Sequence, residues 1–152
     1  MDRGALASFW AAFVRANPSA RETIPETVAF GDSAELQSAL ARLVVTGRKR
    51  ATTSLLQAYG GDPLPARGTL FIVIDGEGVP HCVCRITSVE IKAFSEVDER
   101  DARDEGEGDC TLRHWTDAHR AFFKREAERG GDFFDEESAV VFERFEVIWK
   151  NG

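Results

Sequence analysis

A short basic run marks the point where a helical pattern ends and an extended pattern begins, and this junction constrains the fold most. Apolar residues recur at helical spacing over residues 36–44, and Gly47 is of the kind that ends a helix. Residues 51–56 then have the composition of a strand. The junction itself, residues 47–54, reads Gly-Arg-Lys-Arg-Ala-Thr-Thr-Ser. It therefore collects a lysine, two arginines and three hydroxyls where a rigid scaffold can present polar groups to a ligand.

The remaining patterns predict helices and strands in an order typical of an α+β domain. An apolar face over residues 6–16 predicts a first helix, and Asp32 and Ser33 are both suited to begin the helix that leads to Gly47. The Gly-rich turn at residues 75–78 predicts a hairpin. A loop with a short extended piece at residues 27–30 is expected before the second helix. Strands are expected at residues 51–56, 69–74, 81–89 with a continuation to 94, and 140–149. An acidic loop or frayed helix is expected at 96–108, and a last helix between Asp109 and Gly130. We expect one domain over residues 1–152.

Composition excludes several classes of protein. No apolar run approaches the ~20 residues that span a membrane, and the N-terminus lacks the layout of a secretory signal, so we expect a cytoplasmic protein with no membrane contact. The 3 cysteines are an odd number, which argues against a disulfide framework. Cys82 and Cys84 fall on one face of an expected strand and are predicted to pack in the core. The histidines have no ligand-like spacing, so we expect no metal and no cofactor.

The charge distribution favours a small local ligand. The net charge is −7, and acidic residues are concentrated at 96–109 and 132–137. The compact basic cluster is confined to residues 48–50. Because proteins that follow a long polyanion usually carry a broad basic surface, no extended DNA-binding surface is expected. A nucleoside, a nucleotide or a short single-stranded RNA fits this balance better.

The spacing Gly-x-Lys-x-x-Thr at residues 47–52 resembles the signature of the ASCH family, whose domains are similar to the PUA-type RNA-binding fold. Four further segments resemble the longer bacterial members, so that the resemblance covers about residues 9–149: Phe30-Gly31-Asp32-Ser33, the turn near Asp75, Glu105-Gly106-Glu107-Gly108-Asp109, and Trp115 with His119, Phe122 and Phe123. The resemblance implies a PUA-like fold, a small mixed or antiparallel β-barrel flanked by helices. An N-terminal helical extension would occupy about residues 1–30.

Lys49 is the first candidate for chemistry. Arg48 and Arg50 disfavour a third neighbouring charge, and desolvation acts in the same direction, so the pKa of Lys49 is predicted to be lowered. Such a lysine can act as a base near neutral pH. The alternative is a solvated lysine in a basic loop.

Thr52, three residues later, is the expected nucleophile. A threonine hydroxyl needs a neighbouring base to remove its proton, and Lys49 would be that base. On a regular strand Thr53 faces away from Thr52, whereas Ser54 shares its side and is expected to bind substrate. The alternative for Thr52 is a β-branched residue that simply suits a strand.

The third catalytic residue is implied by the resemblance. In ASCH members similar to N4-acetylcytidine amidohydrolase, the lysine and threonine of the motif work with a glutamate before the last helix. Glu107 is the expected acid here, Glu105 is the second choice with a role in substrate binding, and Asp109 is expected to cap the helix. The alternative is a solvated acidic loop.

Four other residues are expected to bind substrate. Trp115 and His119 lie four apart on the last helix, where an aromatic ring can stack on a base, although a packed histidine is the alternative for His119. Arg48 and Arg50 would meet phosphate or a developing oxyanion.

Three functions that would use the same pocket remain open at this stage, and a structural or protein-interaction role is the remaining alternative. The leading hypothesis is hydrolysis of an acyl group from the exocyclic amine of a modified nucleoside such as N4-acetylcytidine. The second is a ribonuclease acting on single-stranded RNA, in which Lys49 activates the ribose 2′-hydroxyl. The third is an RNA-binding module without catalysis.

Overall fold

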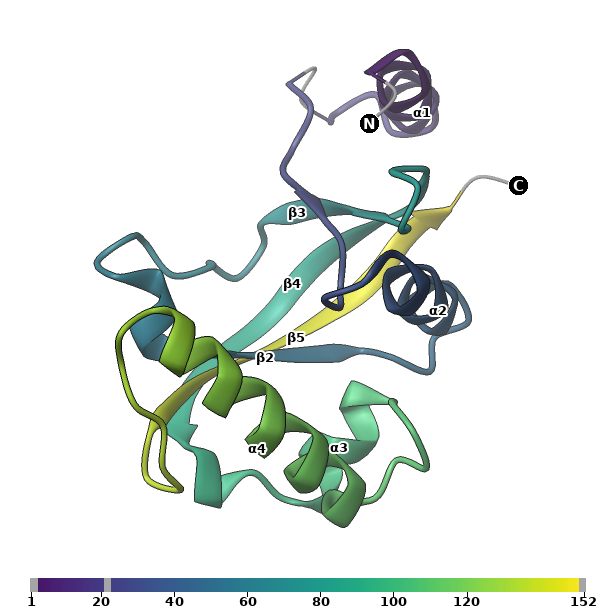
Figure 1. Cartoon of the computed structure of the whole chain (residues 1–152). Helices are drawn as coiled ribbons and strands as arrows, with labels where there is room; N and C mark the ends of the chain where they lie inside the picture. Colours follow the sequence, from purple (N-terminus) through teal and green to yellow (C-terminus); the bar gives the residue numbers. More distant parts are fainter. Residues whose placement is uncertain (1–2, 21–22, 151–152) are drawn as a thin grey trace. The chain divides into compact units, whose positions relative to one another are not determined.

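The computed structural model describes residues 3–20 and 23–150, whose helices and strands are labelled in Figure 1. The chain divides into two compact units. The first unit contains residues up to 47, residues 68–85 and residues from 146 onward, and the second contains residues 48–67 and 86–145. The predicted N-terminal extension includes residues 1–2 and 21–22, which lie outside the described residues.

Five strands pair in the order β1-β3-β4-β5-β2. Their bounds are Thr27–Val28 (β1), Ala51–Leu55 (β2), Leu70–Ile74 (β3), Pro80–Ala93 (β4) and Ala139–Lys150 (β5). β1 is parallel to β3, whereas the β3–β4 and β2–β5 pairs are antiparallel. The mixed sheet with flanking helices confirms the α+β class. The expected closure into a barrel is wrong, because β1 and β2 form the edges of an open sheet.

The first unit packs two helices on its strands. Helix α1 (Arg3–Ala16) buries Phe9, Trp10 and Phe13 against Ile72 of β3 and Val83 of β4. Helix α2 (Ala34–Val45) contacts β3, and among its described residues Leu40, Ala41 and Val44 are buried. Both helices were expected from their apolar spacing.

The beginning and end of α2 follow the sequence signals. Of the two expected caps, Ser33 is the N-cap, and its hydroxyl accepts a hydrogen bond from the Leu36 amide at 3.1 Å. Gly47, with φ +83°, follows the helix in the left-handed region. The basic run therefore starts directly after a well-defined helix end.

The second unit packs α3 (Glu99–Glu105) and α4 (Leu112–Arg129) around an apolar cluster. α3 contacts both β2 and α4. The three elements are labelled in Figure 1. The cluster draws on β2, on the short helix η2 (Phe94–Glu96), on both α-helices and on β5, through Leu55, Phe94, Val97, Ala102, Trp115, Phe123, Ala127 and Val140. A second short helix, η1 (Leu56–Tyr59), follows β2.

Helix α3 lies within the acidic stretch for which the sequence predicted a loop or a frayed helix. Asp98 and Asp101 form a capping box, in which each carboxylate accepts a hydrogen bond from the amide of the other residue. Arg144 of β5 pairs with Asp101 at 2.6 Å and with Asp104 at 3.0 Å, and Lys92 of β4 also pairs with Asp101. These cations offset the repulsion that would otherwise disfavour a helix so rich in acid.

The start of α4 differs slightly from the prediction. Thr111, and not Asp109, is the N-cap, and its hydroxyl accepts a hydrogen bond from the His114 amide at 3.1 Å. Asp109 supports this cap, because its carboxylate accepts hydrogen bonds from the Thr111 amide at 3.0 Å and from the Thr111 hydroxyl at 2.6 Å. Across the described residues, no helix has the length and apolar content needed to cross a membrane.

Candidate functional site

The candidate site lies in the second unit, where the stretch entering β2 meets the stretch that follows α3. Lys49, Ala51, Thr53 and Leu55 alternate along the first stretch and are all buried. This alternation places them on one face, as expected for extended backbone. A lysine on a buried face must find compensating charge inside the protein.

Lys49 finds that charge in two carboxylates. Its ammonium Nζ lies 2.7 Å from Glu105 Oε1 and 2.8 Å from Glu107 Oε2, and it donates a third hydrogen bond to the Ala51 carbonyl at 2.9 Å. Only 1% of the Lys49 surface is exposed. The structure therefore brings together Lys49 and both glutamates that the sequence singled out.

Glu105 is the centre of this cluster. While Oε1 faces Lys49, Oε2 accepts hydrogen bonds from the Thr53 hydroxyl at 2.6 Å and from Trp115 Nε1 at 2.8 Å. His119 Nε2 lies 3.3 Å from the same oxygen. Glu105 is fully buried, so its partners are all protein groups and a ligand cannot reach it directly. Its expected role in binding substrate remains a prediction that this geometry does not favour.

Glu107 differs from Glu105 in exposure. A quarter of its side chain (25%) is exposed, and its Oε2 accepts the hydrogen bond from Lys49. The exposed part of the side chain can therefore meet water or a ligand. Of the two acids in this cluster, Glu107 is the one suited to exchange a proton with a bound molecule.

The charge state of Lys49 is opposite to the expectation. The sequence suggested that Arg48 and Arg50 lower its pKa. In the structure, burial does oppose the charge, but the carboxylates of Glu105 and Glu107 outweigh burial and raise the pKa of Lys49 above its ordinary value. The resting site therefore holds an ammonium, and Lys49 is not a free base.

Glu105 and His119 respond to the same surroundings. Burial disfavours ionisation of Glu105, but the Lys49 charge and the His119 hydrogen bond hold the pKa of Glu105 well below its ordinary value. Burial likewise opposes a charge on His119, but its hydrogen bond to Glu105 and the Glu105 charge raise the pKa of His119.

A tight loop holds Glu107 in place. Gly106 ends α3 with φ +68°, and a Cβ added there would lie 2.1 Å from the Arg48 carbonyl oxygen. At Gly108 an added Cβ would lie 2.2 Å from the ring of His114, an exposed side chain that can move aside. Arg48 Nη2 donates to the Gly108 carbonyl at 2.5 Å and lies 3.4 Å from Cys110 Sγ. Arg48 thus stabilises the loop through these contacts, whereas the sequence suggested that its guanidinium binds phosphate.

The structure does not bring Thr52 into the cluster. Strand alternation places Thr52 and Ser54 on the opposite face of β2 from Thr53, and both are half-buried. The hydroxyl that bonds within the cluster belongs to Thr53. Thr53 was not among the expected site residues, although alternation along an extended chain places it on the same face as Lys49. Arg50 is also directed away, and its side chain, 55% exposed, pairs with Asp104 at 3.0 Å. The catalytic role of Thr52 stays a prediction.

Trp115 and His119 join the cluster on the α4 side. Trp115 is buried and stacks on Phe94 at a centroid distance of 5.2 Å and on His119 at 4.3 Å. His119 keeps 14% of its side chain exposed. Of the two residues expected to stack on a base, only His119 therefore retains a surface that a ligand can touch.

The model of the ASCH domain family matches residues 26–149 of this chain. The chain belongs to the ASCH domain family. This confirms the resemblance carried by the Gly-x-Lys-x-x-Thr motif, and it places the chain among domains generally associated with RNA binding and hydrolysis. None of the curated proteins gives a significant match.

Two solved structures resemble this ASCH domain over most of their length. An ASCH domain from Lactobacillus crispatus JV V101 is 33% identical with a TM-score of 0.87, and the alignment covers 95% of this chain and 94% of that one. Protein EF3133 from Enterococcus faecalis V583 is 34% identical with a TM-score of 0.87, covering 95% and 88%. The α+β architecture described above is thus an ASCH domain architecture.

The donor atoms of Glu105, Glu107 and His119 lie within 4.8 Å of one another, which raises the question of a metal ion. The Lys49 ammonium already bonds one oxygen of each glutamate. The other oxygen of Glu105 is engaged by three protein donors. In this ASCH domain the lysine supplies the positive charge that a metal would supply, and these three residues are not assigned as metal ligands.

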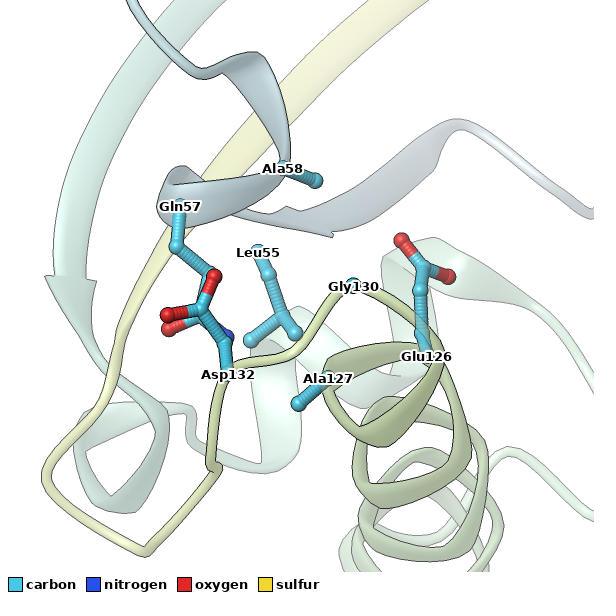
Figure 2. A pocket seen from close by; sticks show the side chains of 7 residues that line it. All are labelled: Leu55, Gln57, Ala58, Glu126, Ala127, Gly130 and Asp132. Carbon is cyan, nitrogen blue, oxygen red and sulfur yellow. The ribbon is translucent and has the colours of Figure 1, made fainter.

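A separate cavity of about 340 Å³ lies near the C-terminal end of α4. Figure 2 shows Asp132 and Gln57 on one side of it and Glu126 on the other, with Leu55 and Ala127 between them. None of the residues that line it belongs to the Lys49 cluster. We therefore place the candidate site of this ASCH domain at the ionic cluster.

Proposed function

We propose that this ASCH domain hydrolyses the amide bond of an N-acylated exocyclic amine on a nucleoside of the cytidine type. The observation that carries the proposal is the partly exposed Glu107 carboxylate, which lies 2.8 Å from a buried, charged Lys49. An acid–base group next to a fixed positive charge is what amide hydrolysis requires.

The chemistry balances with water as the nucleophile. Glu107 takes a proton from a water molecule, and the resulting hydroxide attacks the acyl carbonyl carbon. The three hydrogens of the buried Lys49 ammonium bond Glu105, Glu107 and the Ala51 carbonyl, so its charge stabilises the oxygen that becomes negative through space and not by direct contact. The C–N bond then breaks, and Glu107 returns the proton to the leaving exocyclic amine. The products are a carboxylic acid and the free nucleoside.

Charge balance favours a neutral substrate. Glu105 and Glu107 place two carboxyl groups beside the single Lys49 ammonium, so the cluster does not attract a phosphodiester strongly. The nearby Arg48 and Arg50 guanidiniums are engaged with the Gly108 carbonyl and with Asp104. This supports a nucleoside over single-stranded RNA as substrate.

Water as nucleophile replaces the role that the sequence suggested for Thr52, and the two mechanisms can be separated. If Thr52 attacks, an acyl-enzyme forms on its hydroxyl and Thr52→Ala abolishes turnover. If Glu107 activates water, Thr52→Ala retains most of the activity, while Glu107→Gln loses at least about a hundredfold, as is usual when an acid–base group is removed.

The test compares wild type with Glu107→Gln, Thr52→Ala and a control, Glu126→Gln, which changes a half-buried acid outside the cluster. Each receives N4-acetylcytidine and a labelled single-stranded RNA, and chromatography follows the products. Deacetylation lost only in Glu107→Gln supports the proposal. RNA cleavage without deacetylation would identify a ribonuclease, and binding of RNA with no turnover would identify a recognition module. Either result would refute the proposed function.

A further inference from the structure

We propose that His119 is a positively charged positioning residue, held in that state by Glu105, and that its proton controls the charge balance of the site. The residue would act on the reaction through its neighbours and not by touching the reacting atoms. The structural part of this inference is independent of the substrate, whereas its consequence for turnover rests on the proposed function.

The hydrogen-bond geometry determines where the protons of His119 lie. Nδ1 is 3.0 Å from the Trp115 carbonyl oxygen, which can only accept, so Nδ1 carries a hydrogen. In a neutral ring Nε2 would then present a lone pair to Glu105 Oε2, 3.3 Å away. Protonation of Nε2 replaces this repulsion with a charge-assisted hydrogen bond. The imidazolium is therefore the form that satisfies both nitrogens.

Aromatic packing holds the His119 ring beside Glu105. Its ring stacks on Trp115 with an interplanar angle of 16°, and Phe123 lies against it at a centroid distance of 5.6 Å. Trp115 is itself fixed by its hydrogen bond to Glu105. A tilt of the His119 ring would break the stack, and a half-turn within the stack would remove both polar contacts, so this orientation is the one that keeps all of them.

The charged groups that face His119 come from three directions. Glu105 ends α3, Glu107 lies on the loop after α3, and Lys49 enters β2. While His119 is protonated the four formal charges cancel. When His119 loses its proton the cluster acquires a net charge of −1, which disfavours a negatively charged transition state. Turnover should therefore fall as the pH rises through the His119 titration.

The structural test is a titration of the three histidines in the full chain by two-bond ¹H–¹⁵N NMR, with His119→Gln to assign the signal. In wild type His119 should titrate above the ordinary histidine pKa of about 6.5, with Nδ1 protonated in the neutral form. Glu105→Gln should lower this pKa by at least about one unit, because it removes the counter-charge. Thr53→Val is the matched control, because it removes a neutral hydrogen bond from the same oxygen and should shift the pKa less.

The outcomes separate this inference from the proposed function. A wild-type His119 that is neutral at pH 6.5, or unchanged in Glu105→Gln, refutes the inference even if N4-acetylcytidine is hydrolysed. If Glu105→Gln does not fold, the wild-type pKa and tautomer decide alone. If His119 titrates as expected but nothing is hydrolysed, only the proposed function fails. Where turnover exists, His119→Gln should remove its alkaline decline, and His81→Gln, which changes a histidine of the first unit, should not.

Discussion

Replacement of Gly106 by alanine tests whether the loop that carries Glu107 is held by direct backbone contact. The added Cβ would lie 2.1 Å from the Arg48 carbonyl oxygen, 2.6 Å from the Arg48 carbonyl carbon and 2.9 Å from Lys49 Cα. All three are backbone atoms, so no flexible side chain can move aside to relieve the contact. Either the loop or the stretch entering β2 must shift.

Gly60 provides a matched control for this substitution. It also ends a short helix in the left-handed region, with φ +62° against +68° for Gly106, but nothing lies within 4 Å of its added Cβ. Gly60→Ala should therefore cost only the left-handed backbone penalty, about 1–2 kcal/mol. Gly106→Ala adds the steric conflict, about 1–3 kcal/mol more, for a total of roughly 2–5 kcal/mol.

Urea denaturation of both variants measures the difference in the free energy of unfolding. Gly106→Ala should also lose activity while Gly60→Ala retains it, because the shifted loop carries Glu107 away from Lys49. If the two variants unfold within about 0.5 kcal/mol of each other, the close approach of the loop to Arg48 is not a feature of the protein in solution and the reasoning fails.

Three further predictions concern the buried charges. Lys49→Met leaves the fully buried Glu105 without its nearest cation and should destabilise the fold by about 3–5 kcal/mol in urea denaturation; a cost below 1 kcal/mol would contradict the buried pair. Because the folded-state pKa of Glu105 is depressed, its contribution to stability is present above its unfolded pKa of about 4.3 and is lost as the pH falls; thermal unfolding between pH 6 and 3 should show this loss, and Glu105→Gln should weaken the pH dependence. Arg144→Met leaves the buried Asp101 with Lys92 as its remaining cation and should cost about 1–3 kcal/mol, whereas Arg85→Met, in an exposed pair with Glu146, should cost at most about 1 kcal/mol.

The local signals in the sequence predicted the secondary structure well. Apolar spacing located α1, α2 and α4, and Gly47 marked the end of α2 before the basic run. The acidic stretch was harder, because eight acids within residues 96–109 oppose a helix unless cations offset them. Those cations, Lys92 and Arg144, come from β4 and β5, and their positions are a property of the fold.

The sequence singled out three residues that the structure brings together, but it did not predict their electrostatics. Lys49, Glu105 and Glu107 were selected from the motifs, yet the predicted pKa shift of Lys49 relied on its neighbours in sequence, Arg48 and Arg50. The carboxylates that reverse the shift lie 56 and 58 residues away. Because side chains alternate along extended backbone, Thr53 lies on the same face as Lys49, four residues earlier. Thr53 could therefore have been selected from the sequence. The family spacing drew attention to Thr52 in its place.

The separation along the chain between Lys49 and its two carboxylates also suggests how the protein could be divided. Residues 60–63 form an exposed turn after η1, where a break in the backbone should disturb few contacts. The N-terminal fragment would then carry Lys49 and Thr53, and the C-terminal fragment would carry Glu105, Glu107 and His119. Neither fragment alone could neutralise its part of the cluster. Reassembly of the two fragments would complete the cluster, so the ASCH fold offers a scaffold for a split-protein reporter whose signal depends on a buried ion pair.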